Sequence, residues 1–237
     1  MTGHHGARSS FRRVVQAAIL SCLVSAVVLA AEEPNKKPNP DAGAKWKKLF
    51  DGKTLKGWKV VEFGGDGEVK VKDGALVLAR GVQLTGVTWN GEKLPSMNYE
   101  ISLEAQRVEG DDFFCGLTFP VGKSPCSFIV GGWGGAVVGL SSIDGLDASE
   151  NETTKYLTFR SKQWYPIRIR VTQKNIAAWI GEKKVADVKT AGRKISIRPE
   201  VELSLPLGFT SWQTTAALRN IKIRSLPAGP NKPSKPK

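Results

Sequence analysis

The sequence has almost no histidine, and this shortage excludes several kinds of chemistry. Its two histidines, His4 and His5, lie near the start of the 237-residue chain, in a segment that has the pattern of an export signal. The mature protein would therefore have no imidazole. Nucleophiles activated by histidine and zinc sites with histidine ligands are excluded on this basis. Acid–base work must fall to Asp, Glu, Tyr or Lys side chains.

Cysteine is also scarce, since only Cys115 and Cys126 follow the leading segment. Two cysteines in an exported protein favour a disulfide. However, a hairpin that turns at Gly122-Lys123 places Cys115 opposite Val130 and Cys126 opposite Phe119. Cys115 and Phe119 lie four residues apart, which is roughly 13 Å along a strand and beyond the reach of a disulfide. We predict two buried thiols.

Helical periodicity is missing as well, because no long apolar stripe with a 3.6-residue period occurs. Short apolar runs end at turn residues about every ten positions, among 25 glycines and 13 prolines. The pattern predicts a single all-β domain of about a dozen strands with no helix. The expected strands include residues 68–72 and 75–79 around an Asp-Gly turn, 98–107, 165–172, 195–197, 201–205 and 217–224.

Residues 1–31 have the pattern of a secretory signal peptide, with a basic start, an apolar run over 14–31 and a small-residue end. Cleavage after Ala30 or Ala31 fits best. An uncleaved membrane anchor and lipoprotein processing at Cys22 are the second and third interpretations. We expect a periplasmic, cell-envelope or secreted protein. The remaining chain divides into a disordered linker (32–44), a folded domain (45–227) and a disordered basic tail (228–237).

Acidic residues are outnumbered by basic ones, with 22 Asp and Glu against 35 Lys and Arg and a net charge of +13. Loss of the three signal arginines lowers +13 to +10. No nucleic-acid-binding motif accompanies this charge, so we expect no nucleic-acid partner. Attraction to anionic surfaces or solubility explains it better. Much of the excess lies near the ends, at Lys36, Lys37, Lys45, Lys47, Lys48, Lys232, Lys235 and Lys237.

Glycine gathers around one tryptophan in the segment from 111 to 154. Trp133 has glycines at 131, 132, 134 and 135, which predict a bare floor where a sugar ring stacks on an open indole. Trp89 and Trp212 are candidate flanking rings for a carbohydrate ligand. Burial of Trp133 in the core is the alternative. Core positions are expected for Trp58, Trp164 and Trp179.

Oxygen-bearing side chains crowd the end of the same segment. Glycoside chemistry needs two carboxyls at the scissile bond, so Glu150 with Asp147 or Glu152 is the candidate catalytic pair, and Asn151 a candidate substrate ligand. Asp144 and Asp147 are candidate ligands of a calcium ion or another divalent metal. A solvated acidic loop is the simpler alternative. Asp111 and Asp112, at a strand entry, either contact the ligand directly or form a turn, and the turn is the favoured interpretation.

Several stretches resemble a large bacterial family. They are LFDGKTLKGW near residue 49, VKDGALVL near 71, the pair WYPIRIRV and IAAWIGEKKVADV, and ALRNIKIR near 217. Together they are similar to the 3-keto-disaccharide hydrolase family, also called 3-keto-glucoside lyase and hydratase and formerly DUF1080. The resemblance covers about 45–226 and implies a concanavalin A-like jelly-roll sandwich of two antiparallel sheets that acts on carbohydrate.

The central strands depart from the motifs of the catalytic members that the chain resembles. They read DDFFCGLTF and SFIVGGWGG, and no acidic residue lies between Asp112 and Asp144. The family's catalytic residues are therefore not carried over. The leading hypothesis is an enzyme that acts on keto-disaccharides or related glycans as a lyase, hydratase or hydrolase. The alternative is a lectin-like module without catalysis, and a scaffold that binds no sugar is a third class.

Overall fold

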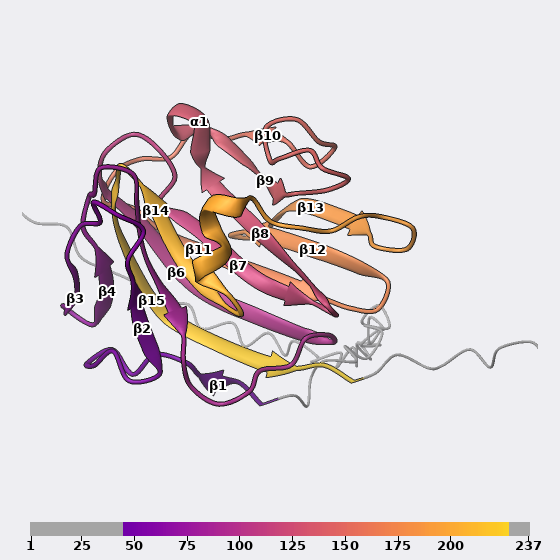
Figure 1. The fold of residues 1–237 in the computed structure, drawn as a ribbon, viewed down its shortest axis with the longest axis horizontal. Coiled ribbons are helices and arrows are strands. Elements are labelled where there is room, and N and C mark those ends of the chain that lie inside the picture. Colours follow the sequence, from indigo (N-terminus) through magenta and orange to yellow (C-terminus); the bar gives the residue numbers. More distant parts are fainter. Residues whose placement is uncertain (1–44, 228–237) are drawn as a thin grey trace, which may run out of the picture. The chain divides into compact units, whose positions relative to one another are not determined.

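The structure, a computed structural model, describes residues 45–227. The predicted signal peptide, linker and basic tail, including Cys22 and both histidines, lie outside the described residues. The described part is a jelly-roll sandwich of two antiparallel sheets, as predicted (Figure 1). Within residues 45–227, no helix is long and apolar enough to cross a bilayer.

One sheet has eight strands and contains both ends of the described chain. Its order is β13 (Lys183–Lys189), β12 (Asn175–Ile180), β11 (Trp164–Val171), β6 (Tyr99–Glu109), β15 (Thr215–Ser225), β4 (Ala75–Leu78) and β3 (Val69–Lys72), with β1 (Lys47–Lys48) paired to β15. The predicted hairpin around Asp73-Gly74 is β3–β4, and both residues have positive φ.

The second sheet has seven strands and carries the pocket described in the next subsection. Its order is β10 (Lys155–Tyr156), β9 (Val137–Ser141), β8 (Ser124–Gly131), β7 (Cys115–Val121), β14 (Gly208–Trp212), β5 (Leu84–Trp89) and β2 (Trp58–Val61). Two short helical turns lie outside the sheets, α1 (Gly132–Gly135) and the 3₁₀ helix η1 (Pro199–Ser204).

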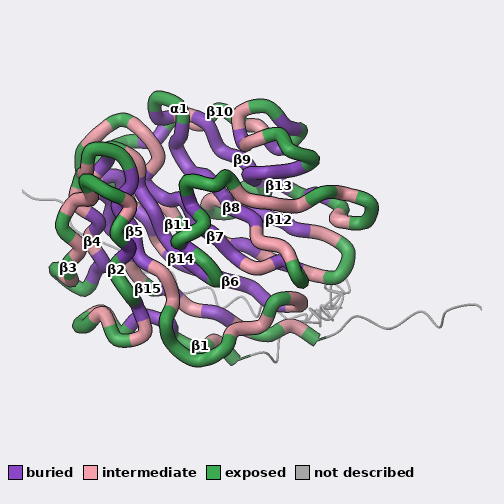
Figure 2. Tube along the Cα trace, viewed as in Figure 1, coloured by how far each residue is buried: buried purple, intermediate pink, exposed green. Residues whose placement is uncertain are grey.

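The core lies between the two sheets because the inward positions of the strands are apolar. In β6, Ile101 and Leu103 are buried, whereas the alternate residue Ser102 faces outward. Figure 2 shows the buried class running along the central strands of both sheets and the exposed class in the connecting loops. Alternation with a period of two therefore fixes which face of each strand meets the other sheet.

The β7–β8 hairpin has the predicted register, with Cys115 opposite Val130 and Cys126 opposite Phe119. Both cysteines are free and fully buried, which agrees with the prediction of two buried thiols. Burial raises the pKa of the Cys115 thiol well above its usual range and that of Cys126 to about 12.

Two strand predictions near residue 200 are wrong. Residues 201–205, expected to form a strand, fall largely in η1, which begins at Pro199. A 3₁₀ helix repeats every three residues, so Val201 and Ser204 are the buried positions of η1. Leu203 and Leu205, which a strand would have placed on the same face as Val201, are 56% and 41% exposed. Residues 195–197 form no named strand, and Ile195 makes only an isolated bridge to Ile143.

The core assignment is correct for Trp58 but wrong for two other tryptophans. Trp58 is buried and donates its indole N–H to the Leu49 carbonyl at 2.9 Å. Trp164 and Trp179 are only partly buried, and each stacks against an arginine guanidinium at 4.0 and 3.9 Å, respectively. An indole and a guanidinium stabilise each other on a half-exposed sheet face, so these strand positions do not require a core.

Candidate active site

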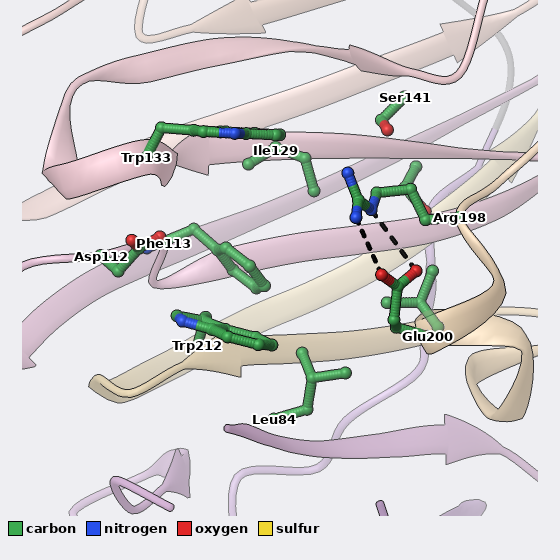
Figure 3. Close-up of a pocket in the computed structure, with 11 residues that line it drawn as sticks. Leu84, Asp112, Phe113, Ile129, Trp133, Ser141, Arg198, Glu200 and Trp212 are labelled. Atoms are coloured by element: carbon green, nitrogen blue, oxygen red, sulfur yellow. Dashed lines mark hydrogen bonds and ion pairs between the residues drawn. The ribbon is translucent and has the colours of Figure 1, made fainter. Parts of the chain in front are cut away.

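A cavity of about 280 Å³ opens on the outer face of the seven-stranded sheet. Its floor includes Ser127 and Ile129, which alternate along β8 with the core residues Phe128 and Val130. Figure 3 shows the side chains that surround it. The lining residues are Leu84, Asp112, Phe113, Ser127, Ile129, Trp133, Ser141, Arg198, Glu200, Val201 and Trp212.

Two tryptophans occupy opposite sides of this pocket. Trp133 extends from α1 and Trp212 from the end of β14, with Phe113 between them (Figure 3). Trp133 is 45% exposed and Trp212 is half-buried, so both rings are accessible. The sequence predicted both tryptophans as sugar-stacking residues. They are 79 residues apart in the sequence (212 − 133 = 79), and the fold places both at this pocket. The arrangement provides two flat apolar walls for a ligand.

Trp133 sits in a left-handed turn that the surrounding glycines make possible. Its own φ and ψ are 49° and 58°, and Gly131, Gly134 and Gly135 have φ of 79°, 81° and 102°. A Cβ on Gly131 would lie 2.6 Å from the Arg107 guanidinium, and one on Gly135 would lie 2.6 Å from the Asp111 carbonyl oxygen. These two glycines therefore shape the turn that presents the indole, rather than the bare floor expected from the sequence.

Arg107, whose role the sequence analysis did not predict, holds this turn by hydrogen bonds to its backbone. Its guanidinium is buried and donates to the carbonyl oxygens of Gly131 (3.3 Å) and Gly135 (2.9 Å). Burial lowers the pKa of Arg107, while Asp112 and then Asp111 oppose that effect. The signal was an arginine in an otherwise alternating strand, at a position that the pattern assigned to the core side.

Asp112 connects the turn to the pocket. Its Oδ1 accepts a hydrogen bond from the Phe113 N–H (2.7 Å) and its Oδ2 accepts one from the Gly134 N–H (3.1 Å). The sequence interpretation of Asp112 as a turn residue captures only the first of these contacts. The carboxylate also lines the pocket beside Trp133, where it can contact a bound ligand.

Arg198 and Glu200 form the polar end of the pocket and were not predicted. Arg198 Nη2 donates to Glu200 Oε1 at 2.8 Å, and its Nε lies 3.4 Å from Glu200 Oε2, as drawn in Figure 3. The hydrogen bond from Arg198 lowers the pKa of Glu200, and the pKa of Arg198 rises in turn. The sequence analysis missed this pair because it expected a strand over 201–205. The 3₁₀ helix η1, which forms there instead, places Arg198 and Glu200 at the pocket.

The predicted catalytic acids Glu150, Asp147 and Glu152 do not line the pocket. Glu152 instead pairs with Arg193 Nη1 at 2.6 Å, and Asp147 accepts from Arg198 Nη1 at 2.8 Å. The hydrogen bond from Arg193 lowers the pKa of Glu152. The acidic segment therefore binds arginines of the loop before η1, and the expected cleft shared by Trp133 and these acids is not formed.

The expected calcium ligands are occupied by protein donors. Asp144 accepts from the Lys194 N–H at 2.7 Å and from Arg193 Nε at 2.5 Å, contacts that lower its pKa. Within residues 45–227, no group of three or more acidic, histidine or cysteine side chains is arranged to hold a metal ion. A cation at Asp144 and Asp147 would have to displace two arginines, which argues against this site.

Asn151 and Trp89, the other two predicted ligand residues, have structural contacts away from the pocket. Asn151 is buried and donates to the carbonyl oxygens of Leu140, Leu146 and Asp147, while its Oδ1 accepts from Thr153. Trp89 packs edge-on against Trp58, with ring centroids 5.2 Å apart. Asn151 thus ties the acidic segment to β9, and Trp89 completes the core.

Two indoles, a carboxylate and an arginine–carboxylate pair on the face of a jelly roll are features suited to a saccharide. The sequence of residues 45–224 matches the model of the 3-keto-alpha-glucoside-1,2-lyase-like domain. The chain belongs to this family. The expectation drawn from the LFDGKTLKGW and ALRNIKIR stretches is thereby confirmed. No curated protein sequence matches the chain.

Solved structures show the same fold as this lyase-like domain at low sequence identity. A Bacillus subtilis protein of unknown function with a galectin-like fold has a TM-score of 0.52 and is 11% identical. The alignment covers 74% of this chain and 92% of the Bacillus subtilis chain. The Crh5 transglycosylase has a TM-score of 0.50 at 9% identity, and the alignment covers 79% of this chain and 85% of the transglycosylase chain. A candidate glycosyl hydrolase from Parabacteroides distasonis has a TM-score of 0.50 at 14% identity, covering 77% and 94%.

Proposed function

We propose that the chain binds a saccharide between Trp133 and Trp212 and acts on 3-keto-glucosides as a 1,2-lyase. The observation that carries the proposal is the pocket itself, in which two accessible indoles are accompanied by the Asp112 carboxylate and the Arg198–Glu200 ion pair. Aromatic rings stack on the apolar face of a pyranose, and the charged groups contact its hydroxyl and keto oxygens. Membership of the lyase-like family supports the reaction class.

The reaction requires a base for the proton on C2, which the neighbouring C3 ketone acidifies. Asp112 is the proposed base, because it lines the pocket and is held by two neutral backbone N–H groups, whereas Glu200 is ion-paired with the Arg198 guanidinium. The C2 proton moves to the carboxylate and the electrons of the C–H bond enter the ketone as an enolate. The enolate then reforms the ketone, a C1–C2 double bond forms, and the C1–O bond breaks. The departing aglycone oxygen takes the proton from Asp112, which returns the carboxylate to its starting state. Arg198 is the proposed cation that stabilises the enolate oxygen.

A non-catalytic saccharide-binding module is the second candidate, and one observation favours it. Of the two carboxyl groups in the pocket, Glu200 has its pKa lowered by Arg198, which makes it a poor donor of a proton to a leaving oxygen. A lectin-like role needs the indoles and the polar groups but no such donor. Binding and turnover must therefore be measured separately.

The test is an NMR measurement of a 3-keto-disaccharide mixed with the protein in D₂O, beside the parent disaccharide that lacks the ketone. A lyase releases the aglycone from the keto sugar alone, leaves a product with a C1–C2 double bond, and exchanges the C2 hydrogen of the remaining substrate for deuterium. Asp112→Asn is expected to abolish exchange and release while saccharide affinity, followed by calorimetry, stays within a few-fold. Binding without exchange selects the binding module, and no binding to either sugar overturns both proposals.

A further inference from the structure

A second cavity lies far from the saccharide pocket. It is built where β1 pairs with the end of β15 in the eight-stranded sheet, and Lys45, Lys47, Lys93, Leu94 and Arg224 contribute to its wall. Figure 1 draws β1 at the lower edge of the domain and α1, which carries Trp133, at the upper edge. A partner bound at β1 therefore leaves the saccharide pocket open.

The charged residues in the wall of this cavity are all cationic. Lys47 pairs with Glu92, and Arg224 pairs with Glu100. Lys45 and Lys93 are exposed, and neither forms an ion pair with any residue between 45 and 227. The two lysines are thus available for an anionic partner, and we call this surface the β1 cationic cleft.

Adjacent strand positions extend the positive charge of the β1 cationic cleft. Lys48 on β1 lies directly opposite Lys222 on β15, and no ion pair to either occurs within the described chain. Like charges directly opposite one another on neighbouring strands destabilise a sheet. The pair concentrates charge at this edge at the expense of sheet stability, which fits a surface that meets negative charge from outside.

Apolar side chains lie among these cations. Trp46 is half-buried beneath Lys222 and Arg224, whose charged groups lie 5.0 and 4.7 Å from its ring. Leu94 and Pro95 are partly exposed in the wall of the cleft. Lysines beside a tryptophan and short apolar side chains are the composition of protein surfaces that rest in the headgroup region of a bilayer.

We propose that the β1 cationic cleft docks the domain on an anionic phospholipid bilayer, with the saccharide pocket directed away from it. Flexible, exposed lysines suit the diffuse charge of many headgroups, whereas a single bound anion is usually held by converging buried donors. The adjoining sequence adds charge of the same sign, with Lys36 and Lys37 before the cleft and three lysines after residue 227. This proposal does not depend on the proposed lyase activity.

The experiment is co-sedimentation of the chain without its predicted signal, residues 32–237, with lipid vesicles. Vesicles of phosphatidylcholine alone are compared with vesicles of phosphatidylcholine and phosphatidylglycerol, at low and high salt. Binding is expected only with phosphatidylglycerol and is expected to weaken as salt rises. Removing the two lysines in Lys45→Gln with Lys93→Gln is expected to lower the partition coefficient roughly thirtyfold.

A matched control variant carries the same loss of charge on the other side of the domain. Lys155→Gln with Lys162→Gln removes two exposed lysines from β10 and from the loop before β11, where the Lys162 N–H donates to the carbonyl oxygen of Arg107 near α1, and binding should stay near that of the wild type. An equal loss in both variants, equal binding to both vesicle types, or no vesicle binding at all overturns the proposal. Retention on heparin without vesicle binding would assign the cleft to an anionic polymer instead.

Discussion

Arg198 Nη1 donates to Asp147 Oδ2 at 2.8 Å, on the side of the guanidinium that Glu200 leaves unoccupied. The side chain of Asp147 is only 13% exposed and also accepts from the Ser149 N–H and hydroxyl. A predicted catalytic acid is therefore a residue that orients the arginine of the pocket. The acidic segment contributes to the site through this contact and not by lining it.

Asp147→Asn should weaken saccharide binding by about 5- to 30-fold, because a hydrogen bond to a charged group contributes about 1–2 kcal/mol. The change removes the charge that holds Arg198 but retains an oxygen for Ser149. Calorimetric titration with the saccharide measures the effect. Asp144→Asn is the control, since Asp144 binds Arg193 instead, and an equal loss in both variants would contradict a specific role for Asp147.

Trp133→Ala should lower saccharide affinity about tenfold, which corresponds to about 1.4 kcal/mol of lost stacking. Stability should change little, because the indole is 45% exposed and packs mainly beside the pocket. Intrinsic fluorescence titration and thermal unfolding measure the two effects. Trp164→Ala, which removes a partly buried indole from the other sheet, should leave affinity unchanged. Equal affinity loss in both variants counts against the pocket.

Gly131→Ala and Gly135→Ala should each destabilise the fold by about 1–3 kcal/mol. Both glycines have positive φ, and an added Cβ would lie 2.6 Å from Arg107 or from the Asp111 backbone. Gly134→Ala is the matched control, because φ there is also positive, at 81°, but nothing lies within 4 Å of the added Cβ. Chemical denaturation separates the two contributions, and an equal loss at all three positions would mean that Arg107 does not constrain the turn.

Saccharide binding should stay constant from neutral pH down to the ordinary glutamate pKa of 4.5 and be lost only as the pH falls through the lower pKa of Glu200. The pKa of Glu200 in the folded protein lies below its ordinary value of 4.5, so the ion pair with Arg198 persists until the pH falls through that lowered pKa. The stabilisation from this pair is present above the unfolded pKa and lost on acidification. Titration of Glu200→Gln gives the comparison, since that variant should lack this acidic transition.

The thiols give a test of the hairpin register. Because burial raises the pKa of both cysteines, neither should react with a thiol reagent at pH 8 in the native chain without its signal. Both should react once the chain is unfolded in denaturant. Fast reaction of one thiol in the native state would show that β7–β8 opens readily, whereas a failure of both to react after unfolding would indicate a disulfide.

Sequence patterns predicted the all-β strands and hairpins because these signals are local, whereas the two-sheet jelly roll was implied by the family resemblance. Alternation along β6 and the turn residues Asp73-Gly74 determine strand faces and hairpins within a few residues, and the β7–β8 register follows from one turn. The glycines around Trp133 likewise marked an accessible ring. Trp89 and Trp212 were proposed as flanking rings without such a signal, and only Trp212 lines the pocket.

The polar half of the pocket depends on contacts that no local pattern encodes. Arg198 and Glu200 reach it through a 3₁₀ turn that replaced an expected strand, and Arg107 acts across 28 residues on the Gly135 carbonyl. The acidic residues at 144–152 resembled a catalytic or metal site in the sequence, but in the folded domain three of them form ion pairs with Arg193 and Arg198. Composition shows where charges are, whereas tertiary packing decides which of them meet.

The central claim is that a saccharide binds between Trp133 and Trp212. Its most direct test is a crystal structure of the protein soaked with a 3-keto-disaccharide. The account predicts one sugar ring against both indoles, with its keto oxygen within hydrogen-bond distance of Arg198. A sugar bound instead at the acidic segment around Glu150, with the tryptophan pocket empty, would contradict it.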